Sequence, residues 1–337
     1  MKLTVLGLGC WGLVLTKLLT NNFDEICGYS RIEDLPDELR LHKKTTKPFN
    51  IQLDDKVQIT SDLAEAIKGA DIILLVVATS AIRVVCEQLK AAGIKDDQVL
   101  VNASKGIELP SLLRMSEVIK SVLPNQKTAV LSGPTLALEV LNGCPTAAVV
   151  ACEDIETAEF VQRACNVPSK FRLYANTDVV GVELGGSLKN VIAIASGFID
   201  ELGMGDNARG ALLTRGMAEI VRVATKFGAK PSTLWGLSGM GDLIATCSSP
   251  LSRNHTVGAM LAKNKKIDDI LAELGSVAEG VKTSKAVCEI AKKLDIEAPL
   301  STAIYEAVYT DKNSKEIFVN LMARALKTEE DFQVIEK

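Results

Sequence analysis

A single lysine in an otherwise apolar stretch is the side chain best placed for acid–base chemistry in this sequence. Between Val179 and Ile199 almost every residue is apolar or small, and the only charged residues are Glu183 and Lys189. The apolar residues recur at helical spacing, which predicts a largely buried helix. Burial makes an ammonium group costly unless it is paired or meets a charged ligand, and it lowers the pKa of a lysine toward neutrality. Lys189 is therefore a candidate catalytic group. The competing interpretation is a pair with Glu183 or a side chain that reaches the surface.

A glycine motif near the N-terminus is suited to holding phosphate. The apolar run Lys2–Leu6 is followed by Gly7-Leu8-Gly9-Cys10-Trp11-Gly12 and then by apolar residues at helical spacing. This order of strand, G-x-G-x-x-G and helix is typical of dinucleotide binding. Gly7 permits a tight turn, Gly9 lets a pyrophosphate approach the backbone, and Gly12 lets the helix pack closely on the strand. The phosphates then lie at a helix N-terminus, where free N–H groups favour anions.

The residues after the second predicted strand bear on which coenzyme is used. This strand, Glu25–Tyr29, is followed by Ser30 and Arg31. An NAD-selective site often has an acidic residue there that binds the ribose 2′-OH. A hydroxyl and a guanidinium can hold a 2′-phosphate instead, so we expect NADPH to be accepted as well as NADH. The alternative is that Arg31 is a solvated loop residue.

Polar and glycine-rich residues follow two further predicted strands. Lys105 comes shortly after the strand at 99–102, and Gly133 and Thr135 follow the strand at 128–131. In open α/β sheets, ligands bind beyond the carboxyl ends of the strands. These three residues are therefore expected at a ligand site, and a solvated turn is the alternative for Lys105.

The second half of the chain supplies a carboxylate and a second phosphate-binding motif. Asp242 follows Gly239-Met240-Gly241, and it could orient Lys189 together with Thr246 and Asn190; an ordinary helix N-cap is the alternative for Asp242. The motif Ser252-Arg253-Asn254 opens another helical stretch, with Ser252 as the expected N-cap. An arginine at a helix N-terminus is a natural phosphate ligand, and a surface arginine is the alternative.

The order of the elements predicts two domains. Strands and helices alternate to about residue 175, whereas strand signals are absent from Asp178 onward. We therefore predict a Rossmann-type, doubly wound α/β dinucleotide-binding domain over residues 1–177, and an all-α substrate and catalytic domain over 178–337. Residues 31–56 are expected to form an irregular connection.

Composition excludes several functions. The chain of 337 residues has a net charge of −4 and no basic stripe, which argues against nucleic-acid binding. Two histidines and eight scattered cysteines without a C-x-x-C pair argue against a metal site and suit a reducing, cytoplasmic location. The apolar run Val179–Ile199 carries two charges and two adjacent glycines, so no membrane insertion is expected.

Taken together, these motifs resemble the bacterial-type NAD(P)-dependent glycerol-3-phosphate dehydrogenases over nearly the whole chain. The shared motifs are G-x-G-x-W-G at Gly7–Gly12, S-K-G-I-E at Ser104–Glu108, S-G-P-T at Ser132–Thr135, E-L-G-G-x-L-K-N-V at Glu183–Val191, G-x-G-D-N at Gly203–Asn207, T-R-G at Thr214–Gly216, G-x-G-D-L at Gly239–Leu243 and S-R-N at Ser252–Asn254. Two features depart from the family: Cys10 replaces a serine or another small residue, and the segment between Arg31 and Thr60 is shortened.

The resemblance implies a reaction and a set of residues. The family reduces dihydroxyacetone phosphate reversibly to sn-glycerol 3-phosphate with NADH or NADPH, which supplies glycerophospholipid synthesis, and Lys189 would be its general acid and base. A homodimer is expected, because dimers are common among such folds. The implied substrate-binding residues are Lys105, Gly133, Thr135, Lys189, Asp242, Ser252, Arg253 and Asn254. The implied cofactor-binding residues are Gly7, Gly9, Cys10, Trp11, Gly12, Arg31, Lys105, Ala137, Arg253, Val277 and Glu279.

Two alternatives are open at this point. A β-hydroxyacid dehydrogenase of the 6-phosphogluconate or hydroxyisobutyrate kind would also combine a nucleotide domain, a helical domain and a lysine after paired glycines. The S-R-N and G-x-G-D-N motifs argue against it. The other alternative is a nucleotide sensor that has lost catalysis. Such a protein would not need all four of Lys105, Lys189, Asp242 and Arg253, so the sequence favours an enzyme.

Overall fold

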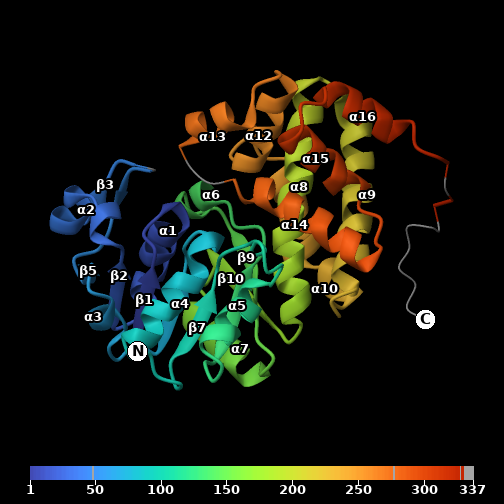
Figure 1. The fold of residues 1–337 in the computed structure, drawn as a ribbon. Coiled ribbons are helices and arrows are strands. Elements are labelled where there is room, and N and C mark those ends of the chain that lie inside the picture. The colour runs from blue at the N-terminus through green and yellow to red at the C-terminus, as the bar shows by residue number, and fades with distance from the viewer. Residues whose placement is uncertain (48, 276–277, 327, 330–337) are drawn as a thin grey trace. The chain divides into compact units, whose positions relative to one another are not determined.

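Short buried strands and amphipathic helices alternate in the first of two units (Figure 1). The computed structural model describes residues 1–47, 49–275, 278–326 and 328–329. The first unit contains Met1–Ser104 and Met115–Val179, and the second contains Lys105–Arg114 and the chain from Val180 onward.

The first unit contains an eight-stranded sheet with strand order β10-β9-β8-β7-β6-β1-β2-β5. Its strands are β1 (Lys2–Leu6), β2 (Glu25–Tyr29), β5 (Val57–Thr60), β6 (Ile72–Leu75), β7 (Val99–Asn102), β8 (Thr128–Ser132), β9 (Thr146–Ala151) and β10 (Phe171–Asn176). Neighbouring strands are parallel except for the antiparallel pair β8 and β9. Leu6 is paired with Tyr29 and Leu75, and Leu75 with Asn102, so the carboxyl ends of four parallel strands are in register.

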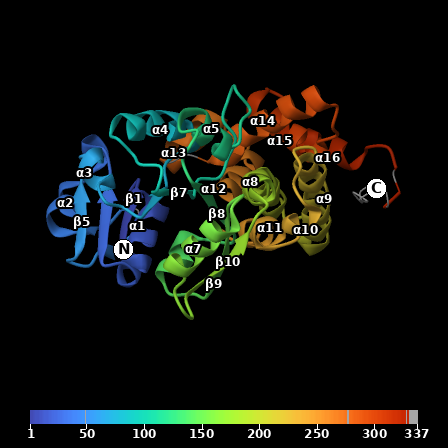
Figure 2. The same ribbon diagram turned by 90° about the horizontal axis from the view of Figure 1, so that it is seen from below.

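Helices cover both faces of this sheet. They are α1 (Cys10–Leu19), α3 (Leu63–Ile67), α4 (Ile82–Ala91), α5 (Met115–Val122), α6 (Ala137–Leu141) and α7 (Ile155–Cys165). Figure 2 shows α1 and α7 on one face and α4 and α5 on the other. This is the doubly wound arrangement, in which strands buried from both sides consist almost entirely of apolar residues.

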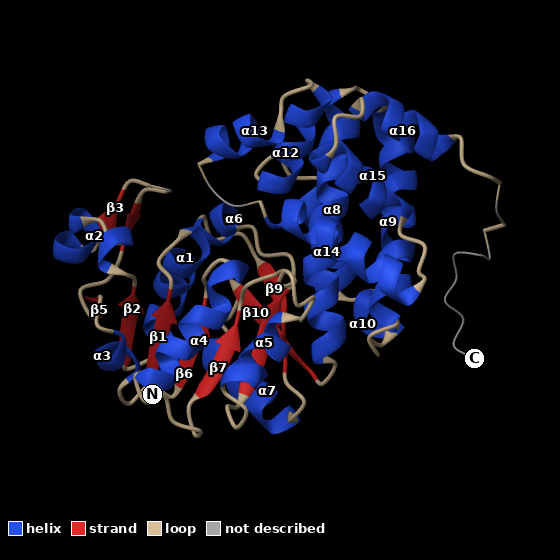
Figure 3. Ribbon diagram, viewed as in Figure 1, coloured by secondary structure: helices blue, strands red, loops and turns tan. Residues whose placement is uncertain are grey.

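The segment predicted to be irregular contains several short elements. Residues 31–56 form η2 (Ile32–Asp34), α2 (Asp37–His42) and an antiparallel pair, β3 (Lys44–Thr45) with β4 (Ile51–Gln52). Two further 3₁₀ turns, η1 (Thr20–Asn22) and η3 (Thr79–Ala81), complete the first unit. In the described part of the chain, all strands precede Val179 (Figure 3).

The second unit is helical and surrounds one buried helix, α8 (Val179–Glu201), seen nearly end-on in Figure 2. Every residue from Gly181 to Ile199 is buried, so α8 is the core helix of this unit although its length and apolarity would also allow a membrane span. The other elements are α9 (Gly205–Thr225), α10 (Pro231–Leu234), a π-helical turn η4 (Leu237–Gly241), α11 (Asp242–Cys247), α12 (Arg253–Ala262), α13 (Ile267–Leu274), α14 (Glu279–Leu294), α15 (Pro299–Tyr309) and α16 (Ser314–Met322).

The predicted fold class is confirmed, but the division of the chain is more complex than a cut between residues 177 and 178. Residues Lys105–Arg114, predicted to lie in the first domain, pack with the helical unit. Arg114 forms a 2.6 Å ion pair with the buried Glu183 of α8, and Ser187 Oγ donates to the Gly106 carbonyl at 3.4 Å. The helix α5 begins at Met115, directly after this segment.

Candidate active site

A close backbone contact brings the candidate acid–base residues together in the helical unit. A Cβ atom on Gly185 of α8 would lie 2.8 Å from the Ser238 carbonyl oxygen, so only a glycine lets the η4 turn approach this closely. Lys189 lies one turn after Gly185 on the same face of α8. The η4 turn leads directly into Asp242, the first residue of α11. Such π-helical turns are frequent at functional sites.

Asp242 is the shared partner of two lysines. Its Oδ1 accepts a hydrogen bond from Lys189 Nζ at 2.9 Å, and its Oδ2 accepts one from Lys105 Nζ at 2.7 Å. Lys189 Nζ also donates to the Thr246 hydroxyl, which in turn donates to Asp242 Oδ1 at 3.1 Å. The side chains of Lys189 and Asp242 are 8% and 2% exposed, whereas Lys105 retains 18% exposure. Two cations around one buried carboxylate leave an excess of positive charge at this site.

The electrostatics of this cluster bring the pKa of Lys189 toward neutral pH. Burial lowers the pKa of Lys189 to about 8, an effect that Lys105 reinforces and Asp242 opposes. Burial alone would raise the pKa of Asp242, but the two ammonium groups lower it below its usual value. Asp242 is therefore a carboxylate at neutral pH, while Lys189 can both give and take a proton.

The structure excludes the alternative partner of Lys189, and it shows that the expectation for Asn190 is wrong. Glu183 does not pair with Lys189, because Glu183 binds Arg114. Asn190 does not hold it either: Asn190 points to α12 and accepts a hydrogen bond from Asn254 Nδ2 at 2.9 Å. One residue along a helix turns the side chain by about 100°, so adjacent residues face different partners.

The S-R-N motif forms the start of α12, as predicted. Ser252 is the N-cap, and its hydroxyl accepts a hydrogen bond from the His255 N–H at 3.3 Å. Arg253, the first residue of the helix, is exposed and forms no ion pair with the described residues. Asn254 is buried and joins three helices, since its Oδ1 also accepts from the Gly280 N–H of α14 at 3.0 Å. The free guanidinium next to open N–H groups is suited to an anion.

The glycine motif of the first unit fits a dinucleotide pyrophosphate. Gly7 has φ +98°, which favours glycine, and a Cβ atom on Gly12 would lie 1.8 Å from the Gly7 carbonyl oxygen. Gly9, by contrast, is exposed and has no atom within 4 Å of its Cβ position. It is the N-cap of α1, yet no side chain caps this helix, whose first turn holds no acidic residue. The N–H groups at this end are therefore available to phosphate oxygens.

The other predicted nucleotide contacts of the first unit have varied environments. Cys10 begins α1, and Trp11 packs edge-on against Phe171 with ring centroids 6.3 Å apart. Arg31 is 60% exposed and forms ion pairs with Asp34 at 2.6 Å and Glu33 at 3.3 Å. A 2′-phosphate would therefore compete with two carboxylates for this guanidinium. Ala137 begins α6.

Gly133 and Thr135 follow the carboxyl end of β8 in the same unit. Gly133 has φ +139°, and a Cβ atom there would lie 2.9 Å from Ala148 Cα of β9. Thr135 Oγ1 donates to the Gly133 carbonyl at 3.1 Å. In the second unit, Glu279 begins α14, and Val277 lies outside the described residues.

Sequence reasoning missed some residues that build the site. The Arg114–Glu183 pair, which joins the Lys105 segment to α8, left no signal beyond an acidic residue in an apolar helix. The joining role of Asn254 was also missed, because its partners are 64 and 26 residues away in sequence.

A Rossmann-type unit with an open phosphate-binding loop, together with a helical unit that buries a lysine, defines a two-domain, nucleotide-dependent oxidoreductase. Comparisons with known proteins are more specific. The model of the NAD-dependent glycerol-3-phosphate dehydrogenase N-terminus matches residues 2–158, and that of the C-terminus matches residues 178–319. The chain belongs to this family.

Individual relatives match along the full length. Glycerol-3-phosphate dehydrogenase [NAD(P)+] of Listeria monocytogenes is 42% identical over 334 residues, which cover 98% of each chain. The enzyme of that name from Bacillus subtilis is also 42% identical and covers 98% of this chain and 96% of its own. The solved structure of glycerol-3-phosphate dehydrogenase from Coxiella burnetii is 32% identical, has a TM-score of 0.90, and covers 96% of this chain and 99% of its own. These matches favour this family over a β-hydroxyacid dehydrogenase and over a sensor.

Proposed function

We propose that Lys189 is the general acid and base with which this chain reduces dihydroxyacetone phosphate to sn-glycerol 3-phosphate. The activity is that of the family, NAD(P)-dependent glycerol-3-phosphate dehydrogenase. The observation that carries the proposed role is the buried ammonium of Lys189, hydrogen-bonded to Asp242 and Thr246, with a pKa of about 8. A general acid works best when its pKa lies near the operating pH.

In this proposal, hydride and proton reach the carbonyl group separately. The reduced nicotinamide, when bound, supplies the hydride to the carbonyl carbon. Lys189 Nζ gives its proton to the carbonyl oxygen, and Asp242 keeps the amine oriented while it is neutral. Lys105 contacts the other oxygen of Asp242, where its positive charge would stabilise negative charge on the substrate oxygen. In the reverse direction, neutral Lys189 takes the hydroxyl proton.

The other assigned residues would bind the two ligands. The N–H groups after Gly9 would hold the coenzyme pyrophosphate, with Cys10, Trp11 and Arg31 nearby. Arg253 at the start of α12 would bind the substrate phosphate and so position the carbonyl group. By the same family resemblance, Lys105, Gly133, Thr135, Asp242, Ser252 and Asn254 belong to the substrate site, and Ala137, Arg253, Val277 and Glu279 to the coenzyme site.

The cellular context is inferred from the family. The product, sn-glycerol 3-phosphate, would enter glycerophospholipid synthesis in the cytoplasm. We expect a homodimer, in keeping with other dehydrogenases of this architecture.

The test is a comparison of initial rates. Purified protein should oxidise NADPH and NADH with dihydroxyacetone phosphate, and should not turn over 6-phosphogluconate or hydroxyisobutyrate with the oxidised coenzymes. Lys189→Met should lower kcat by about 10³-fold while the affinity for NADPH stays close to that of the wild type. A variant that keeps more than a tenth of the activity would overturn the role of Lys189. The ratio of the rates with NADPH and NADH tests whether Arg31 leaves Glu33 and Asp34 to bind the 2′-phosphate of NADPH.

A further inference from the structure

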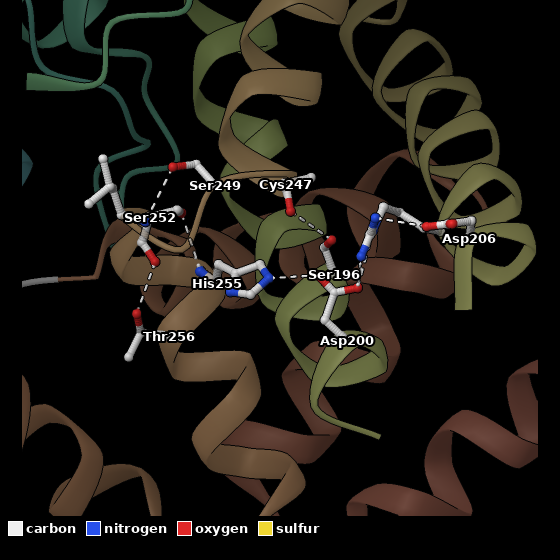
Figure 4. A network of polar contacts seen from close by, with 10 residues as sticks. Ser196, Asp200, Asp206, Cys247, Ser249, Ser252, His255 and Thr256 are labelled. Carbon is white, nitrogen blue, oxygen red and sulfur yellow. Dashed lines mark hydrogen bonds and ion pairs between the residues drawn. The ribbon is translucent and has the colours of Figure 1, made fainter. Parts of the chain in front are cut away.

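A polar network next to the S-R-N motif takes no part in the proton transfer described above. His255 lies in the first turn of α12, and its Nε2 donates to Asp200 Oδ2 at 2.8 Å (Figure 4). Arg209 of α9 binds Asp200 from another helix, with Nη2 at 2.8 Å and Nε at 3.2 Å from Oδ1. Arg209 Nη1 also binds Asp206 at 3.0 Å, so the G-x-G-D-N motif at Gly203–Asn207 helps to place this arginine.

The network joins α12 to the helix that carries Lys189. Asp200 lies on α8, three turns after Lys189 and on nearly the same face. The two helices are in backbone contact there: a Cβ atom on Gly197 would lie 1.8 Å from the His255 carbonyl oxygen, and one on Gly258 would lie 1.8 Å from that of Ile194. Such contact fixes the separation of the helix axes. The backbone contact does not fix how far α12 rotates about its own axis or shifts along α8, so side chains must determine both.

Two side-chain hydrogen bonds hold the first turn of α12 to α8, and both come from residues that directly follow Arg253. Asn254 binds Asn190, and His255 binds Asp200. His255 and Asp200 are largely shielded from water, with side chains 16% and 21% exposed. Burial alone would raise the pKa of Asp200, but the hydrogen bonds from His255 and Arg209 lower it, so the acceptor is an ionised carboxylate at neutral pH. A hydrogen bond to a charged group is stronger than one between neutral groups.

We propose that His255, held by Asp200, is a positioning residue that fixes the phosphate-binding end of α12 relative to Lys189. The inference rests on the proposed function, because it takes Arg253 and the first turn of α12 as the substrate-phosphate site. His255 does not touch substrate in this view. Its amide donates to the Ser252 cap while its ring is hydrogen-bonded to Asp200, so this one residue links the first turn of α12 to α8.

A matched pair of variants separates the hydrogen bond from the bulk of the ring. The amide nitrogen of glutamine reaches the position of Nε2, whereas that of asparagine ends near Nδ1, too short to reach Asp200. His255→Asn should raise the KM for dihydroxyacetone phosphate about tenfold with little change in kcat or in the KM for NADPH, because a displaced phosphate site weakens binding of ground state and transition state alike. His255→Gln should restore a KM within about twofold of the wild type. Inorganic phosphate, as a competitive inhibitor, should lose affinity in His255→Asn by the same factor as the substrate.

Controls distinguish this inference from the proposed function. Asp200→Ala should raise the same KM at least as much, because it also removes the partner of Arg209. Adding His255→Asn to Asp200→Ala should cause no further rise, because the contact between His255 and Asp200 is already lost. An unchanged KM in His255→Asn, or an equal loss in His255→Gln, would overturn the positioning role. Arg253→Met tests the phosphate site itself. If the KM for dihydroxyacetone phosphate is unchanged in this variant, the proposed phosphate site is rejected. If Arg253→Met raises this KM strongly and His255→Asn does not raise it, only the positioning role of His255 is rejected.

Discussion

Two lysines share one buried carboxylate in the helical unit, and in the proposed mechanism their electrostatic balance sets the working pH of the enzyme. Lys189 is buried and has a pKa of about 8, lowered by burial and by Lys105 and partly restored by Asp242. In the proposed mechanism, reduction needs the protonated lysine, and oxidation needs the neutral one. We therefore expect kcat/KM for dihydroxyacetone phosphate to fall as the pH rises through about 8, while kcat/KM for glycerol 3-phosphate rises over the same range.

Asp242→Asn tests this assignment through the direction of a pH shift. The negative charge of Asp242 raises the pKa of Lys189, so its removal should lower that pKa and move the alkaline limb of the reduction profile to lower pH. The measurement is kcat/KM against pH for both proteins. Thr246→Val is the matched control, because it removes a hydrogen bond from Lys189 without changing any charge, and its shift should be smaller. If the alkaline fall of kcat/KM occurs at the same pH in Asp242→Asn as in the wild type, a group other than Lys189 is responsible for it.

At the scale of elements, the start of α15 depends on a side chain from another helix. The N-cap residue Ala298 has no capping side chain, and Glu219 of α9 takes this role from 79 residues away in sequence. Its Oε2 accepts from the Leu300 N–H at 2.8 Å, and its Oε1 accepts from the N–H and hydroxyl of Ser301 at 2.9 and 2.6 Å. Glu219 is only 3% exposed, so water cannot replace it.

Removing this cap should cost substantial stability. Glu219→Ala leaves buried N–H groups without an acceptor, and we expect a loss of about 2–4 kcal/mol in the free energy of unfolding. Glu219→Gln keeps one acceptor oxygen and should lose about half as much. Urea unfolding measures both, and Glu273→Ala, which removes only an exposed ion pair with Lys265, should change stability by less than about 0.5 kcal/mol. Equal stability of Glu219→Ala and Glu273→Ala would show that α15 does not need this cap.

The features that could be predicted from the sequence are those that depend on residues close to one another in the chain. The strand, glycine motif and helix around Gly7–Gly12 are contiguous, and so is the apolar spacing of α8, so both were predicted correctly. Ser252 was predicted as an N-cap because its partner, the His255 N–H, is three residues away. The cap of α3 is local in the same way, because Asp62 accepts from the Glu65 N–H three residues away.

The features that sequence reasoning could not reach depend on contacts distant in sequence. The passage of Lys105–Arg114 into the helical unit depends on Glu183, 69 residues beyond Arg114. Asn190 was assigned to Lys189 because it is its neighbour, but its partner Asn254 comes from α12. Periodicity predicts which face of a helix is buried, and it does not predict which helix will lie against that face.

At the scale of the whole molecule, the chain has two separate hydrophobic cores, and in our proposal the pyrophosphate loop and the acid–base residues belong to different ones. One core is built around the sheet and includes Leu3, Val5 and Leu74, and the other is built around α8 and includes Val191 and Ile194. The coenzyme loop at Gly7–Gly12 belongs to the first unit, and Lys105, Lys189, Asp242 and Arg253 all belong to the second. Binding of coenzyme and proton transfer should therefore be separable by mutation.

Thermal unfolding with and without NADPH tests this separation. A ligand at about 100 times its Kd stabilises the native state by about 2.7 kcal/mol, which should raise Tm by about 4 to 10 °C. Lys189→Met should keep this rise, because its change lies in the other unit. Gly9→Asp should abolish it: the Cβ position has no atom within 4 Å, so the variant folds with an unchanged Tm, but its carboxylate repels the pyrophosphate. If NADPH still raises the Tm of Gly9→Asp, the coenzyme does not bind at this loop. If NADPH no longer raises the Tm of Lys189→Met, that lysine takes part in coenzyme binding.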